Sequence, residues 1–138
     1  MGAKFALQML ATPEMSKEIT QPTLLYKKGV RHLTKTILFP IRLLYTSLTG
    51  KIGHNGEAVK YYLANNKDNK AKLVEAAFNW RCKNPENEIE AVQLIDKVLI
   101  ELYIQFIDEY QEKMYEYNEI NIANDLIKWR ETLTNGAA

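Results

Sequence analysis

The sequence predicts one all-α domain, an antiparallel bundle of about five helices with one long central helix. Its 138 residues suit a single domain, and 46% apolar and 25% charged residues are ordinary for a globular protein. Glycines and prolines are few, and beyond Gly56 only Pro85 and Gly136 interrupt the pattern. Apolar residues recur every third or fourth position, as in an amphipathic helix, and no useful segment alternates as a strand does.

Pro22 marks the boundary between two segments in the first half of the chain. Residues 1–22 are expected to be an N-terminal extension or linker, one short apolar turn or helix followed by a polar connector, and residues 23–138 to form the bundle domain. A long helix is predicted over 22–49, because a proline is tolerated in a first turn and the apolar spacing is helical. Pro40 lies inside this run, so we expect a kink or break there. Gly50 is expected to end the helix.

The second half of the chain shows stronger periodicity. Two short helices are predicted over 57–65 and 69–82. Apolar residues then step by three or four for eight turns between residues 89 and 117, which predicts one long helix. Asn118 or Asn121 is expected to cap a last helix. Short links between these segments favour a bundle.

Composition excludes several classes of protein. A single cysteine leaves no internal disulfide and fits a reducing cytosol, so a cytoplasmic location is expected. The longest apolar stretch, residues 37–48, is interrupted by Pro40 and Arg42 and is too short to span a bilayer, so no membrane partner is expected. The sequence contains no dinucleotide or P-loop motif, and its two histidines and one cysteine are too widely spaced for a metal site.

Charge is distributed unevenly along the chain. The formal net charge is +1, yet residues 19–56 contain no Asp or Glu and carry +6, whereas residues 57–138 carry −5. A basic face on a nearly neutral protein indicates a localised anionic partner. The basic stretch lacks repeated arginines and the remainder is acidic, which argues against nucleic acid.

The segment from Arg42 to Ile52 is the strongest candidate site. Arg42 and Tyr45 are three residues apart and share a helix face. Thr49 and Gly50 then turn the chain, so that Lys51 projects near the same end. Two cations, a phenol and a hydroxyl could therefore converge on an anion, and arginine with lysine is a common pairing for polyphosphate. The alternative is that both cations are ordinary surface residues and that the tyrosine belongs to the core.

This segment resembles the C-terminal helical domain of aminoglycoside-type adenylyltransferases and related bacterial nucleotidyltransferases. The shared pattern is Arg42-x-x-Tyr45, then Thr49-Gly50-Lys51-Ile52, then Ala58, and Leu73-Val74-Glu75-Ala76 resembles the following helix. The resemblance extends from about His32 to Arg81 and covers roughly a third of the chain well. It implies that Arg42 and Lys51 contact the triphosphate of a nucleoside triphosphate, while Tyr45 and Thr49 shape the wall of the cleft.

The resemblance also implies a missing part. In that family a preceding domain with paired aspartates holds Mg²⁺ and the nucleotide, and nothing before Thr23 resembles it. ATP with Mg²⁺ is therefore expected only when a catalytic domain is supplied elsewhere, by a missing N-terminal or partner domain, and this chain alone is not a complete enzyme. Leu44 replaces a usual tryptophan, Asn55 replaces a common lysine, and residues 21–41 lack acids and tryptophan, which argues against aminoglycoside modification.

A different class of function stays open beside this one. The long helix is rich in aromatic residues, and several of them exposed in one patch would mark a protein-interaction bundle. Those residues are Tyr103, Phe106, Tyr110, Tyr115 and Tyr117. The sequence does not fix the oligomeric state and leaves a homodimer open, nor does it identify an acceptor substrate.

Overall fold

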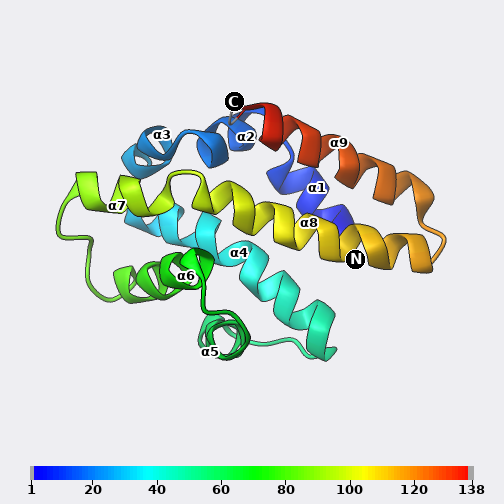
Figure 1. Ribbon diagram of the computed structural model, residues 1–138, viewed down its shortest axis with the longest axis horizontal. Helices are drawn as coiled ribbons and strands as arrows, with labels where there is room; N and C mark the ends of the chain where they lie inside the picture. The colour runs from blue at the N-terminus through cyan, green and yellow to red at the C-terminus, as the bar shows by residue number, and fades with distance from the viewer. Residues whose placement is uncertain (1, 137–138) are drawn as a thin grey trace.

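The computed structural model describes residues 2–136. Met1, in the predicted segment 1–22, and residues 137–138, in the predicted segment 23–138, lie outside the described residues. Over the described residues the chain forms nine α-helices and no strand (Figure 1). They are α1 (Gly2–Leu10), α2 (Pro13–Thr20), α3 (Pro22–Lys27), α4 (Val30–Thr49), α5 (Asn55–Asn65), α6 (Asn69–Trp80), α7 (Glu88–Ile95), α8 (Val98–Glu116) and α9 (Ile120–Gly136). The all-α bundle predicted from the sequence is confirmed, with more and shorter helices than the five expected.

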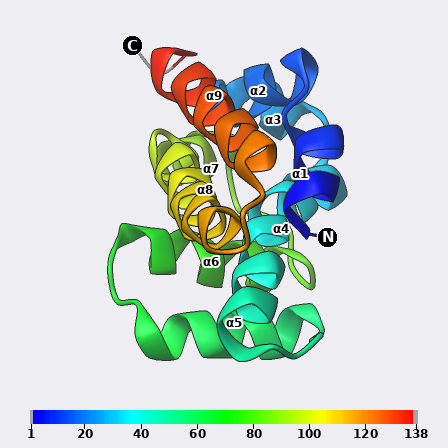
Figure 2. The ribbon, with the colours of Figure 1, turned by 90° about the vertical axis from the view of Figure 1, so that its right-hand side faces the viewer.

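Helix α8 lies at the centre of the bundle. In Figures 1 and 2 it is placed between α9 and the α4–α6 group, and α1–α3 cover one side. Tyr103 and Phe106 of α8 are fully buried and pack edge-on against Trp129 of α9. Helix α8 runs antiparallel to α9 but in the same direction as α4, because α5, α6 and the loop that follows carry the chain back before α7 leads into α8 (Figure 1). One hydrophobic core therefore joins all these layers.

Residues 1–22 were expected to be an extension or linker, and over the described part they are helical and belong to the core. Ala3, Ala6, Leu10 and Ile19 are buried in the same cluster as the central helices. The polar connector forms α2, whose first turn is capped by the Thr12 side chain. The few apolar residues of α2 are covered by neighbouring helices, and the local spacing of residues does not predict such a tertiary contact.

Two predicted helices are divided, each at a residue with positive φ. The helix predicted over 22–49 is interrupted at Gly29, whose φ of 102° is a conformation that glycine adopts readily. Helix α4 then continues through Pro40 without a break. The helix predicted over 89–117 is interrupted at Lys97, whose φ is 65°. Helices α5 and α6 match their predicted ranges closely. Among residues 2–136 no helix is long and apolar enough to cross a membrane.

Candidate functional site

Four cationic side chains line one cavity of about 320 Å³ between α4, the start of α5 and the end of α6. We call it the basic cavity. Its walls are formed by Arg31, Thr34, Lys35, Leu38, Phe39, Arg42, Asn55 and Arg81. Three of the cations come from α4, and Arg81 follows the last residue of α6. The volume falls within the range of small-molecule sites.

The sequence of α4 explains why its three cations share a face. Arg31, Lys35 and Arg42 are spaced by four and seven residues, which is close to whole turns of an α-helix. The opposite face carries Leu33 and Ile37, which are fully buried in the core. Burial of that apolar face fixes the rotation of α4, so the cations must point away from the core.

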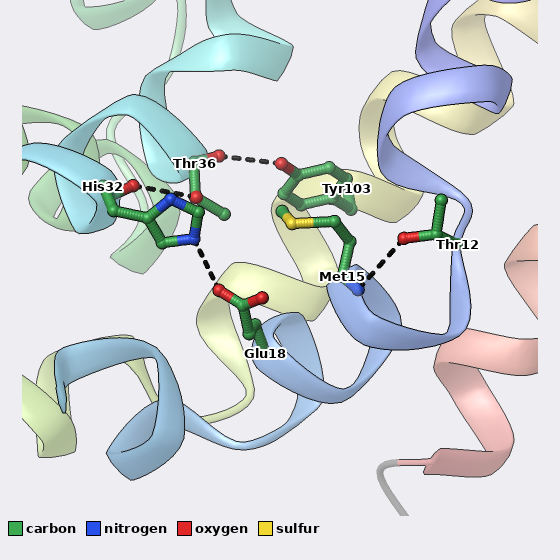
Figure 3. A network of polar contacts seen from close by, with 6 residues as sticks. All are labelled: Thr12, Met15, Glu18, His32, Thr36 and Tyr103. Carbon is green, nitrogen blue, oxygen red and sulfur yellow. Dashed lines mark hydrogen bonds and ion pairs between the residues drawn. The ribbon is translucent and has the colours of Figure 1, made fainter. Parts of the chain in front are cut away.

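The start of α4 is held in place by a polar network that Figure 3 shows. Nε2 of His32 pairs with the buried Glu18 carboxylate of α2 at 2.5 Å. The Thr36 hydroxyl donates to the His32 carbonyl, and the buried Tyr103 hydroxyl of α8 donates to the Thr36 carbonyl at 2.8 Å. Two neighbouring helices therefore fix the segment of α4 that carries Arg31 and Lys35.

The basic cavity is electrostatically uncompensated. No Asp or Glu lines it, and within residues 2–136 none of its four cations forms an ion pair with a carboxylate. Asn55, the first residue of α5, also lines the cavity and carries no charge. All four cationic residues are exposed to solvent, and an anion bound in the cavity would be attracted by several like charges at once. The cavity is therefore suited to a multiply charged anion.

Of the four residues predicted to form the site, only Arg42 lines this cavity. The Tyr45 ring packs on Tyr61 and on Gly53, where a Cβ atom would lie 2.5 Å from the ring. The Thr49 hydroxyl donates to the Tyr45 carbonyl and accepts from the Lys51 amide, so it terminates the helix. Lys51 is exposed in the loop that follows and does not line the basic cavity.

The physical reason is the end of α4. Gly50 adopts the left-handed conformation, with φ of 74°, and the chain turns away from the helix axis there. Sequence proximity to Arg42 therefore does not place Lys51 beside it. The structure instead brings in Arg31, Lys35 and Arg81, which the sequence did not single out as a set. The acid-free stretch and the helical spacing of the first two were available signals, whereas nothing local pointed to Arg81.

The aromatic residues of the long helix do not form one exposed patch. Tyr103, Phe106 and Tyr110 are buried in the core. Tyr115 and Tyr117 are exposed near the turn into α9. The exposed aromatic surface that would favour a protein-interaction bundle is therefore limited to Tyr115 and Tyr117, at the tip of the α8–α9 hairpin.

Among the described residues no cluster of three or more His, Cys, Asp or Glu side chains is placed to hold a metal ion. No protein-family model, curated protein or solved structure matches the chain. The chemistry of the basic cavity is therefore the feature of this chain that points to a function.

Proposed function

We propose that this chain binds a nucleoside triphosphate with its phosphates in the basic cavity, as the helical half of a nucleotidyltransferase-like assembly. The observation that carries the proposal is the convergence of four cations in one cavity without a carboxylate partner among residues 2–136. The resemblance of the Arg42–Ile52 segment to nucleotidyltransferase helical domains supports the second part.

The side chains of the cavity match the chemistry of a polyphosphate. A guanidinium presents a planar fork of N–H donors that bridges two phosphate oxygens, and the cavity has three of them, Arg31, Arg42 and Arg81. Lys35 adds a mobile point charge. Because the donors come from two helices, they can surround a chain of phosphates rather than bind a single one.

The same walls do not fit Mg²⁺, which prefers carboxylate and water oxygens. In the proposed assembly the metal and the catalytic carboxylates come from another domain or chain. The role of this chain is then to bind and orient the phosphates from the opposite side. Its own binding of ATP requires no metal, and Mg²⁺ is expected to weaken it by neutralising part of the negative charge of the phosphates.

The proposal is tested by calorimetric titration with ATP and with inorganic tripolyphosphate, each in EDTA and then with Mg²⁺. Arg42→Ala and Arg81→Ala should each weaken binding of both ligands roughly ten- to a hundredfold, as expected for loss of a charged hydrogen-bonding partner. Lys51→Ala is the matched control. It removes a nearby exposed cation outside the cavity and should change affinity less than about twofold.

The Lys51→Ala control also distinguishes the basic cavity from the site that the sequence pattern predicts at Arg42 and Lys51. If Lys51→Ala weakens binding as much as Arg42→Ala, the phosphates bind at the end of α4, as the sequence pattern alone predicts. Absence of binding of either ligand at millimolar concentration, or binding that depends on added Mg²⁺, would contradict the proposal.

A further inference from the structure

Two apolar hollows adjoin the basic cavity, and Phe39 lines all three. One hollow, of about 370 Å³, shares Phe39 and Arg42 with the cavity and is otherwise walled mainly by Phe5, Leu43 and Ile52. The other, of about 200 Å³, also contains Phe5 and Phe39. The basic cavity therefore adjoins two apolar hollows that share the aromatic rings of Phe5 and Phe39.

The two rings stack on each other but are incompletely covered. Phe5 of α1 stacks on Phe39 of α4 with ring centroids 5.7 Å apart and an angle of 18° between the planes. Phe5 keeps 48% of its surface exposed, and Ile52 beside it keeps 91%. Large apolar side chains this exposed next to a ligand cavity leave an area that a bound group can cover, at a gain of about 25 cal/mol for each Å².

We infer that the base of the bound nucleotide packs against the Phe5–Phe39 pair while its phosphates occupy the basic cavity. This inference rests on the proposed function and extends it from the phosphates to the rest of the ligand. A flat base offers an aromatic face of the kind that stacks on exposed phenylalanine. Arg42 lies on both the cationic and the apolar side, which places the boundary between phosphate and nucleoside at this residue.

The inference includes a statement about selectivity. No Asn, Gln, Asp or Glu side chain of the described residues lines either apolar hollow. Of the polar side chains that do, Arg42 and Lys35 also line the basic cavity, His32 pairs with Glu18, and the Thr36 hydroxyl donates to the His32 carbonyl, which leaves the single hydroxyl of Thr46. Hydrogen bonds to the edge of a base are what distinguish one base from another, whereas stacking is tolerant of sequence. ATP and GTP should therefore bind with affinities within about threefold of each other, and both should bind more tightly than tripolyphosphate.

The experiment compares ATP, GTP and tripolyphosphate on the full chain and on Phe5→Leu by calorimetric titration in EDTA, because Phe5 lines both apolar hollows but not the basic cavity. Loss of the aromatic face should weaken both nucleotides roughly 5- to 100-fold, the range found for base stacking on aromatic side chains. Tripolyphosphate affinity should stay within about twofold, which also shows that the variant is folded and that its basic cavity is intact. Phe5→Trp, which keeps an aromatic face, should retain nucleotide binding.

Phe78→Leu is the matched control, since Phe78 is a partly exposed phenylalanine of α6 that lines none of the three spaces. It should leave all three affinities unchanged. Equal affinity of wild type for ATP and tripolyphosphate, or an equal effect of Phe5→Leu on both, would overturn the inference while polyphosphate binding still stands. Absence of tripolyphosphate and nucleotide binding would remove the proposed function itself.

Discussion

Lys97 shows how one residue decides the course of two helices. Its φ of 65° is left-handed, a conformation that costs a residue with a Cβ atom about 1–2 kcal/mol. Ile95 before it and Leu99 after it are both fully buried, and the Asp96 amide closes α7 on the Val92 carbonyl. Burial on both sides of the turn holds the strained residue in place, because relaxing it would withdraw one of the two helices from the core.

Replacing Lys97 with glycine should therefore stabilise the protein. Glycine adopts this conformation without strain, and its greater freedom in the unfolded chain offsets part of the gain, so we expect an increase of about 0.5–1 kcal/mol in the free energy of unfolding. Urea denaturation measures it. Lys97→Ala removes the same side chain but keeps the strain, and stabilisation by this control as large as that by glycine would show that the side chain is the cause.

At the scale of elements, a proline and a tyrosine compensate for each other across α4 and α8. Pro40 lacks an N–H, so it leaves the Thr36 carbonyl without its helical donor. The buried Tyr103 hydroxyl donates to that carbonyl instead. Farther along the same pair of helices, the Tyr110 hydroxyl donates to the Leu43 carbonyl. These bonds explain why α4 continues through a proline and why α8 lies against it.

This compensation makes the effect of Tyr103→Phe depend on residue 40. In the wild-type background the variant leaves a buried carbonyl unsatisfied and should cost about 1–3 kcal/mol of unfolding free energy. With Pro40→Ala the backbone regains a donor, and the cost of Tyr103→Phe should fall below about 1 kcal/mol. A double-mutant cycle by urea denaturation gives the coupling, and additive effects would refute the compensation.

Tyr110→Phe is the matched control, because it removes a similar hydrogen bond between α8 and α4 that does not involve Pro40. Its acceptor, the Leu43 carbonyl, is also within reach of the Ser47 amide along the helix, so loss of the phenol leaves that carbonyl satisfied. We expect a cost of about 0.5–1.5 kcal/mol that does not change with Pro40→Ala.

At the scale of the whole molecule, buried phenols set the response to alkali. Burial, with a smaller effect of Glu109, raises the pKa of Tyr110 to about 12. Burial also raises the pKa of Tyr62 and Tyr103, assisted by Asp68 and Glu18 respectively. In the unfolded chain tyrosine ionises near pH 10. The fold therefore keeps these groups protonated at a pH where the unfolded chain releases their protons.

Stability should accordingly fall as the pH rises above about 10. Above that value the unfolded state binds fewer protons than the native state, so the free energy of unfolding decreases with pH, by up to about 1.4 kcal/mol per pH unit for each such tyrosine. The contribution of Tyr110 is fully present below pH 10 and is lost as the pH passes about 12. Urea denaturation between pH 8 and 11.5 should show a shallower decline for Tyr110→Phe than for wild type, and identical slopes would contradict this account.

The helices of this protein were largely predictable, and the exceptions are instructive. Residues 55–65 and 69–80 were found nearly as expected because helical periodicity is written within three or four positions. The turn at Lys97 was not predicted, because the apolar spacing on both sides stays helical and the residue itself disfavours the conformation. Residues 1–22 were expected to be an extension or linker, with one short apolar turn or helix and then a polar connector; that α1 and α2 pack into the common core follows only from contacts with distant helices.

For the candidate site, the sequence by itself determined the acid-free basic stretch and the common face of Arg31, Lys35 and Arg42 on one helix. Only the tertiary structure decided that Arg81 and Phe5 join them and that Lys51 does not. The reason is that a helical face follows from local spacing, whereas a cavity depends on how separate helices are rotated and packed. That packing is set by burial of the opposite, apolar faces in the common core.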